Sequence, residues 1–165
     1  MTTLNNLSEN DIYYTPKEVW NNILHYLDRD KIYLDPFYGD GSNINNLKEL
    51  GLNCIGADID YFDLLQNMHF DIIITNSPFS KNILVQFLYN LEALQVPFVL
   101  VLPVYKIFTK YFRTAFRSYK DIQIIIPKER LSFIDPTKPN KKSNPSFVCC
   151  YLCYKMDLPS DIIFI

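Results

Sequence analysis

The sequence contains little that would place the chain in a membrane or outside the cell. Its longest apolar run, residues 96–104, is too short and too interrupted by proline to span a bilayer. The first residues lack the basic and apolar segments of a secretory signal, and the four cysteines fit a reducing compartment. We therefore expect a cytoplasmic protein that is not secreted and has no membrane as a partner.

Histidine and glycine are also scarce, with two and four copies respectively. The pair Cys150-x-x-Cys153 would need two further ligands to hold zinc, and His25 and His69 lie far back in the chain. The pair also falls in an apolar run, so we interpret both cysteines as core residues and expect no metal. No Gly-Lys-Ser/Thr follows Gly41, which excludes a Walker phosphate loop.

Charges of the two signs are segregated along the chain, although the net charge is only −2. Residues 1–100 hold 5 Lys or Arg against 13 Asp or Glu, whereas residues 101–165 hold 11 against 5. This division predicts an anion-binding surface in the second half, and carboxylates used for a cofactor or for chemistry in the first. Chance segregation on a solvated surface is the alternative interpretation.

Short apolar runs alternate with stretches of helical periodicity. This alternation predicts an α/β fold, with a mostly parallel sheet and helices on both of its faces. We expect Thr15 to cap the first helix and Gly51 to close the second. Residues 1–11 are expected to form a flexible N-terminal arm and residues 12–165 a single domain. The expected strands are 31–34, 53–57, 71–75, 98–102, 122–126 and 147–154, and the expected helices 17–24, 42–50, 82–94 and 105–119.

The sharpest polar signals follow three of the expected strands immediately. Asp35 begins the turn Asp35–Gly41, Asp58 ends the next strand, and Asn76 ends the third. In sheets of this kind, ligands bind beyond the carboxyl ends of the strands. The three signals therefore predict one site at that edge of the sheet.

Each of these signals suits a particular ligand group. The Asp35 carboxylate suits a cation such as the amino group of a methionine moiety, and Asp58 suits the hydroxyls of a ribose. The Asn76 side-chain oxygen and the Ser77 carbonyl would each accept an N–H of an amine, and Phe79 would stack on the base that carries it. Taken singly, the motifs also fit a strand-to-helix turn, a strand-end cap and an Asx turn with Phe79 in the core.

Together the ordered motifs carry a specific resemblance. Thr15-Pro16, Asp35-Pro36-Phe37-x-Gly39-x-Gly41, Asp58 and Asn76-Ser77-Pro78-Phe79 resemble the S-adenosylmethionine-dependent amino-methyltransferases of the DNA adenine-N6 family, whose hallmark is a D/N-P-P-Y/F turn. The short Dam-like enzymes of phages and large viruses are most similar, over roughly residues 13–155. The resemblance implies a Rossmann-like class I methyltransferase fold and S-adenosylmethionine as cofactor. For a viral source, the compartment would be the host cytoplasm or nucleus.

The resemblance also implies roles for individual residues in methyl transfer to the N6 amine of adenine in DNA. The amine would attack the methyl group directly, without a covalent enzyme intermediate. The catalytic turn that holds the amine and its ring would be Asn76, Ser77, Pro78 and Phe79. The cofactor would contact Tyr14, Thr15, Pro16, Asp35, Pro36, Phe37, Gly39 and Gly41 around its methionine part, Asp58 (with Asp60 as a competing residue) at its ribose, and Asp63 at its adenine.

The sequence departs from the family pattern in two places. Ser77 replaces the first proline of the turn, which keeps the carbonyl acceptor but loses part of the stiffness, although Pro78 still restricts Ser77. Asp58 and Asn76 are 18 positions apart, which leaves no room for a full helix and strand between them. A sheet that lacks the usual third strand is therefore part of the expectation, and it weakens the assignment of Asp63.

The basic second half supplies an expected substrate surface. On a helix over 105–119, the cations Lys106, Lys110, Arg113 and Arg117 would share one face. With Lys141 and Lys142 they would form a track for phosphates, interleaved with aromatic residues. The alternative is a solvated helix face whose aromatic residues point into the core.

We expect nucleic acid as the partner, DNA rather than RNA. The chain has no residues left for a separate recognition domain. The recognised sequence would therefore be short, or a partner subunit or a homodimer would provide specificity. A single-stranded or RNA substrate is the third possibility. Two alternatives remain open. The first is amino-group methylation of RNA or protein, and the second is a non-catalytic subunit that binds the cofactor or nucleic acid.

Overall fold

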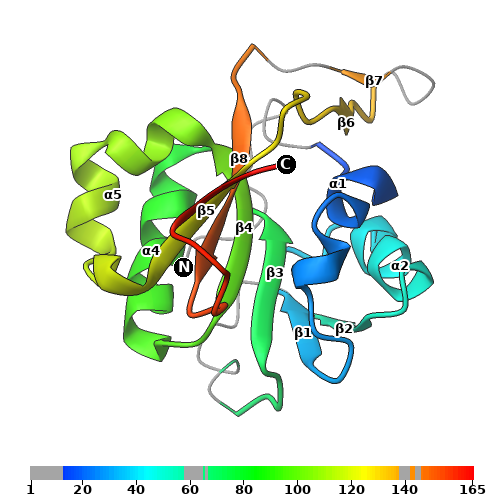
Figure 1. The fold of residues 1–165 in the computed structure, drawn as a ribbon, viewed down its shortest axis with the longest axis horizontal. Coiled ribbons are helices and arrows are strands. Elements are labelled where there is room, and N and C mark those ends of the chain that lie inside the picture. The colour runs from blue at the N-terminus through cyan, green and yellow to red at the C-terminus, as the bar shows by residue number, and fades with distance from the viewer. Residues whose placement is uncertain (1–12, 58–64, 66, 138–141, 144–145) are drawn as a thin grey trace.

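The computed structural model describes residues 13–57, 65, 67–137, 142–143 and 146–165. A seven-stranded sheet runs through this part of the chain (Figure 1). In spatial order its strands are β2 (Asn53–Gly56), β1 (Ile32–Asp35), β3 (Ile72–Asn76), β4 (Phe98–Pro103), β8 (Cys149–Tyr154), β5 (Ile122–Ile126) and β9 (Ile162–Phe164). A separate antiparallel pair is formed by β6 (Phe133–Ile134) and β7 (Lys142–Ser143).

The sheet is mostly parallel, as predicted. Strands β2, β1, β3 and β4 pair in parallel, and so do β5 and β9. The exception is β8, which is antiparallel to both β4 and β5 and lies between them. Among the described residues, β2 and β9 are the two edge strands of this sheet. Residues 58–64 and 66 lie outside the described residues, so the missing third strand stays a prediction.

Helices cover both faces of the sheet, which confirms the expected layering. The apolar residues of β3 alternate: Ile72 and Ile74 pack in one core cluster, and Ile73 in the other. The first cluster is closed by α1 (Lys17–Asn21) and α2 (Ser42–Glu49), and the second by α4 (Lys81–Leu94) and α5 (Lys110–Ala115). A strand buried on both faces has no polar alternation, which is why it appears in the sequence as a continuous apolar run.

The first helix differs from its prediction at both ends. Pro16 occupies the N-cap position in extended conformation, rather than Thr15, and no side chain caps this end. The helix ends at Asn21 and is followed by the short 3-10 helix η3 (Leu24–Tyr26). Gly51 does follow α2, in the left-handed conformation that glycine tolerates best.

The expected helix over 105–119 is wrong as a single element. It is divided into the 3-10 helix η5 (Val104–Phe108), the helix α5 and a second 3-10 helix, η6 (Tyr119–Asp121). The break falls at Thr109, which is extended and whose hydroxyl accepts a hydrogen bond from the Phe112 N–H at 3.3 Å. A threonine cap inside the run therefore starts a new helix there. The strands β6, β7 and β9 were not predicted.

The four cysteines are buried and free. Cys149 and Cys153 pack on one face of the sheet and Cys150 on the other, because neighbouring residues of β8 alternate. The two cysteines of the C-x-x-C pair therefore point to opposite faces, which prevents them from holding one ion. Burial raises the pKa of each of the four thiols to about 12.

The longest helix of the described ranges is α4, with 14 residues. Within those ranges, no helix combines the length and the apolar composition that crossing a bilayer requires.

Candidate functional site

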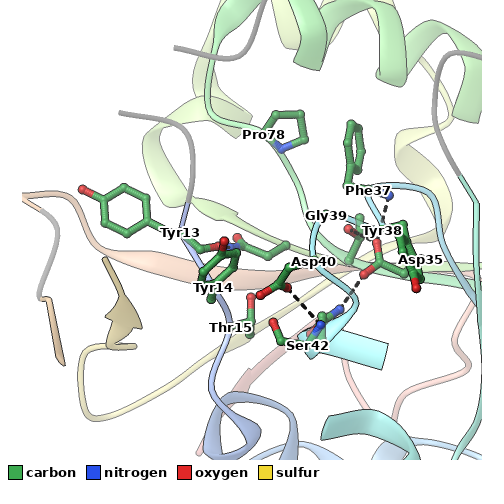
Figure 2. A pocket seen from close by; sticks show the side chains of 13 residues that line it. Tyr13, Tyr14, Thr15, Asp35, Phe37, Tyr38, Gly39, Asp40, Ser42 and Pro78 are labelled. Carbon is green, nitrogen blue, oxygen red and sulfur yellow. Dashed lines mark hydrogen bonds between the residues drawn. The ribbon is translucent and has the colours of Figure 1, made fainter. Parts of the chain in front are cut away.

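A pocket lies at the carboxyl ends of β1 and β3, where the polar signals of the sequence converge (Figure 2). It holds about 580 Å³ of space, part of it open to solvent. Asp35 and Asn76 line the same pocket, so the expected neighbourhood of the two motifs is found. The full lining is Tyr13, Tyr14, Thr15, Asp35, Phe37, Tyr38, Gly39, Asp40, Ser42, Asn43, Thr75, Asn76 and Pro78.

Asp35 is the centre of a buried hydrogen-bond network on the β1 side of the pocket. Its Oδ1 accepts from the Phe37 N–H at 3.0 Å and from the Thr75 hydroxyl at 2.7 Å. Its Oδ2 accepts from the Asn43 amide at 2.7 Å, and the Asn43 oxygen in turn accepts from the Trp20 indole N–H at 2.6 Å. The network links β1, β3, α1 and α2 around one carboxyl group.

Burial is the dominant influence on the pKa of Asp35 and raises it, while the hydrogen bonds from Asn43, Thr75 and Phe37 oppose the rise. The group is 1% exposed, so an ionised Asp35 lacks solvent as a source of stabilisation. A cation placed in the pocket would favour its ionised form. Asp35 is thus as much a structural anchor of the pocket wall as a ligand group.

The loop between β1 and α2 turns back under the pocket. Gly39 and Gly41 have positive φ angles of 56° and 80°, which explains why glycine occupies these two positions. Asp40 between them is exposed and lines the pocket, and its Oδ1 accepts from the Ser42 N–H at 2.9 Å. Its carboxylate is therefore available to a ligand in a way that the Asp35 carboxylate is not.

The segment Tyr13–Thr15 forms the opposite wall, and Figure 2 shows it across the pocket from Asp35 and Phe37. Two backbone hydrogen bonds, of 3.0 and 2.9 Å, pair Tyr14 with Ile134 of β6. The Asn46 amide on α2 donates to the Thr15 carbonyl at 2.9 Å. The wall is thus fixed from two sides, although its residues precede the first helix.

Asn76 closes the pocket at the end of β3 and leaves an acceptor open. Its Nδ2 lies 3.5 Å from the Tyr13 carbonyl, a long hydrogen bond. Its Oδ1 is buried and has no hydrogen-bond partner in the described part of the chain. A buried carbonyl oxygen without a donor costs about 1–3 kcal/mol. The position is therefore stabilised by any ligand that brings an N–H to it.

Ser77 ties the corner to β4. Its N–H and its hydroxyl both donate to the Val101 carbonyl, each at 3.1 Å. A proline at this position would make neither bond. The stiffness that the sequence loses with the family's first proline is thus supplied by two hydrogen bonds. Ser77 is 2% exposed and does not line the pocket, whereas Pro78 does.

Phe79 and Lys106 differ most from their predicted roles. The Phe79 ring packs against Phe147 at a centroid distance of 4.9 Å, and against Tyr13 at 6.5 Å, outside the pocket lining. Lys106 was expected on an exposed face but is 8% exposed, because its ammonium donates to the Phe79 carbonyl at 2.9 Å. Lys106 Nζ also lies 5.8 Å from the centroid of the Tyr111 ring. Lys106 supports the turn of residues 76–79 from inside and is not available as a phosphate contact.

The predicted cofactor residues divide into three groups. Five line the pocket, three lie next to it in sequence without lining it, and two lie outside the described residues. In that order, they are Tyr14, Thr15, Asp35, Phe37 and Gly39; Pro16, Pro36 and Gly41; and Asp58 and Asp63. The lining residues that were not predicted are Tyr13, Tyr38, Asp40, Ser42, Asn43 and Thr75. All six are immediate or near neighbours of predicted residues: Thr75 lies near the end of β3, Asp40 lies between the two glycines, and Ser42 and Asn43 begin α2.

The other predicted phosphate contacts do not share one helix face. Lys110 and Arg113 are exposed on α5, three positions apart, so these two do lie on one side of it. Arg117 is exposed beyond the end of α5, beside Glu92, whose carboxylate accepts from the Arg117 N–H at 2.9 Å. Lys141 lies outside the described residues, and the structure describes only the backbone of Lys142, in β7.

Comparison with known proteins shows the fold. The sequence matches no family model and no curated protein significantly. A crystal structure from Listeria monocytogenes, named provisionally as a class I S-adenosylmethionine-dependent methyltransferase, is similar with a TM-score of 0.56 and 13% sequence identity. The similarity covers 92% of this chain, which spans 64% of the Listeria chain. Together with the mostly parallel seven-stranded sheet, it identifies the fold as that of the Rossmann-like class I methyltransferases.

Proposed function

We propose that this protein transfers a methyl group from S-adenosylmethionine to an exocyclic amine, with the N6 amine of adenine in DNA as the substrate. The observation that carries the proposal is the buried, partnerless Oδ1 of Asn76 in the pocket that Asp35 also lines. An acceptor of this kind fits a substrate that donates an N–H. The fold and the Asn-Ser-Pro-Phe corner support the same chemistry independently.

The pocket fits the proposed cofactor in the chemistry of its walls. The exposed Asp40 carboxylate, with Asp35 behind it, suits the ammonium of the methionine part. The positive φ of Gly39 and the lack of a side chain there let the backbone approach a ligand closely. When bound, S-adenosylmethionine supplies an electrophilic methyl group on a sulfonium.

The Asn76 corner would act on the amine. Its Oδ1 would accept one N–H, which orients the amine so that the nitrogen lone pair points to the methyl group and holds the nitrogen in place for in-line attack. The nitrogen would gain the methyl group as the bond between that group and the cofactor sulfur breaks, which leaves S-adenosylhomocysteine, and would lose a proton to solvent. Ser77 fixes the corner through Val101, and Lys106 fixes it through the Phe79 carbonyl. No cysteine is needed, which agrees with the raised pKa of all four thiols.

Calorimetry with S-adenosylhomocysteine followed by a labelled-methyl assay tests the proposal. We expect the compound to bind, and the label to appear as N6-methyladenine when DNA, RNA and protein pools are offered separately. Absence of binding would refute the cofactor assignment. Label found only in RNA or only in protein would show that this pool, and not DNA, contains the substrate. Binding without transfer to any pool would indicate a non-catalytic subunit.

The variant Asp40→Asn makes the calorimetry sharper. It keeps the oxygen that accepts from the Ser42 N–H and removes only the negative charge. We expect weaker binding of S-adenosylhomocysteine, by roughly 2- to 5-fold, and unchanged binding of 5′-methylthioadenosine, which lacks the amino-acid part. Equal losses for both compounds would show that Asp40 does not face the ammonium.

A further inference from the structure

We propose that the exposed rings of Tyr105 and Phe108, continued by Lys110 and Arg113, bind single-stranded nucleic acid beside the pocket. We call these four residues the η5–α5 surface. The inference rests on the proposed function and deepens it, because it names the form of substrate that would deliver an amine to Asn76.

Tyr105 and Phe108 lie on the same side of a 3-10 helix and face solvent. Their exposed fractions are 51% and 74%, large for aromatic side chains. A 3-10 helix has three residues per turn, so residues three positions apart are stacked above one another. Lys106 of the same helix is turned inward, toward Phe79. The Lys106 Nζ also lies 5.3 Å from the centre of the Tyr105 ring, so Tyr105 is partly engaged within the protein and Phe108 is the more exposed of the two rings.

The position of these rings is set by a backbone that is held firmly. The Val104 N–H donates to the Val148 carbonyl at 2.9 Å, and the Thr109 N–H and hydroxyl both donate to the Lys106 carbonyl, at 3.1 and 2.6 Å. The exposure of Tyr105 and Phe108 therefore belongs to an ordered segment. Two exposed aromatic rings on one side of an ordered segment fit a surface with a stacking partner.

The charged residues near the two rings in sequence are of one sign. Residues 93–120 contain no Asp or Glu, and the exposed cations Lys110 and Arg113 follow Phe108 on α5. Lys81, exposed at the start of α4, has its Nζ 5.4 Å from the centre of the Tyr111 ring. Exposed rings followed by exposed cations can bind bases by stacking and the backbone by charge. An acidic or a purely apolar partner would not use this combination.

The surface also adjoins the corner that would receive the amine. It begins where β4 ends, and β4 is joined to Ser77 through the Val101 carbonyl. Lys106 lies between the two rings in sequence and is bonded to Phe79. A strand lying along η5 and α5 would therefore pass the catalytic turn with its backbone near the cations.

Stacking on Tyr105 and Phe108 requires bases whose faces are free. In a duplex, each base face is covered by its neighbours and each adenine amine is paired, so a duplex substrate must first be opened at a cost of a few kcal/mol. In a single strand, the faces of the bases and the adenine amines are accessible without that cost. The η5–α5 surface thus favours a single strand over a duplex of the same sequence.

Fluorescence anisotropy with labelled oligonucleotides tests this inference. The probes are an adenine-containing 12-mer as single-stranded DNA, the same sequence as RNA, and its blunt DNA duplex, each at two salt concentrations. We expect the full-length wild type to bind a single strand, of DNA or of RNA, more tightly than the duplex. Phe108→Ala should weaken single-strand binding roughly 5- to 150-fold, Tyr105→Ala should act in the same direction, and both should change duplex binding little.

Phe164→Ala is the matched control, because Phe164 is also a highly exposed phenylalanine, at 78%, but lies in β9 at the end of the sheet. The inference would be overturned if Phe108→Ala reduced the affinity for a single strand no more than Phe164→Ala does. It would also be overturned if the wild type bound the duplex as tightly as both single strands. Circular dichroism checks that each variant is folded. Failure of the proposed function is separate: it shows as absent binding of S-adenosylhomocysteine, which does not depend on the η5–α5 surface.

Discussion

The two polar corners of the pocket are built in opposite ways. At the end of β1, both oxygens of the Asp35 carboxyl group accept hydrogen bonds, and the network extends through Asn43 to Trp20. At the end of β3, the segment from Asn76 to Ser80 contains the two buried side-chain atoms of the described residues that lack a partner, Asn76 Oδ1 and Ser80 Oγ. One corner is satisfied within the protein, and the other is not.

This difference fits a division of labour. A wall that must hold a cofactor in one place benefits from a closed network, because every bond in it limits movement. A corner that must grip a substrate benefits from an acceptor that nothing in the protein already uses. Leaving such an atom unsatisfied costs stability, which is a cost typical of functional sites. The predictions below test whether the satisfied corner supports structure and the unsatisfied one supports chemistry.

The largest effect is expected at Asn76. Asn76→Ala removes the open acceptor, so the rate of methyl transfer should fall by about 10²–10³. Binding of S-adenosylhomocysteine should change little, and the free energy of unfolding should not fall, because Oδ1 has no partner to lose in the described residues and its burial without a donor costs stability in the wild type. A methyl-transfer time course and calorimetry on the same preparations measure both. Asn45→Ala, an exposed asparagine of α2, is the control. Transfer that survives Asn76→Ala would exclude the mechanism.

The next effect is expected at Lys106, which acts through the Phe79 carbonyl. Lys106→Met has a similar length but no donor, so the corner should be less well positioned and kcat should fall roughly 10- to 100-fold. Binding of S-adenosylhomocysteine should be unchanged. Lys106→Arg keeps a donor and should recover part of kcat. If Lys106 instead contacts phosphates, as its sequence position suggested, Lys106→Met will raise the KM for nucleic acid and leave kcat intact.

The position of Lys106 is a feature that the sequence did not predict. The layers and six of the seven strands of the sheet could be predicted, because buried strands appear as continuous apolar runs and amphipathic helices leave periodic patterns. The spacing of Lys106, Lys110, Arg113 and Arg117 suits a helix equally well whether that helix exists or not. The capping by Thr109, and the burial of Lys106 beneath Phe79, depend on contacts that the sequence does not reveal.

The pocket was predicted in outline. The rule that ligands bind beyond the carboxyl ends of strands placed Asp35 and Asn76 at one edge of the sheet, and both line the pocket found there. The rule does not say which carboxylate of the pocket is exposed, so Asp40 was missed although it lies between two predicted glycines. Nor could β9 be predicted, because three residues at the edge of a sheet carry almost no periodic signal.

A smaller effect, on stability and its pH dependence, is expected at Asp35. Asp35→Asn places an amide N–H₂ against the Asn43 amide, whose oxygen is already used by Trp20, so the variant should be less stable by about 1–3 kcal/mol. Burial raises the pKa of Asp35 above its ordinary value of 3.8. The folded protein therefore keeps this proton where the unfolded chain has lost it. The contribution of Asp35 protonation to the stability of the folded protein is full below pH 3.8 and is lost as the pH rises through the folded-state pKa of Asp35.

The gap in unfolding free energy between wild type and Asp35→Asn should thus narrow as the pH rises from about 4, because only the wild type titrates at this position. Urea unfolding at several pH values measures the gap, and the other carboxyl groups, common to both proteins, cancel. A gap that widens with pH would mean that hydrogen bonds from Asn43, Thr75 and Phe37 outweigh burial. The β1 corner would then be built around a charged carboxylate.

The smallest effect is expected at Ser77, the residue in which the turn departs from the family pattern. Ser77→Ala removes the hydroxyl bond to the Val101 carbonyl but keeps the N–H bond, so the free energy of unfolding should fall by only about 1 kcal/mol. Because the N–H still ties the corner to β4, kcat should fall less than for Lys106→Met. Ser77→Thr keeps a hydroxyl and separates the bond from the volume change. If Ser77→Ala instead lost as much kcat as Asn76→Ala without any loss of stability, the Ser77 hydroxyl would take part in the chemistry. Ser77 would then not be only an anchor beside the open acceptor of Asn76, and the contrast within this corner would be wrong.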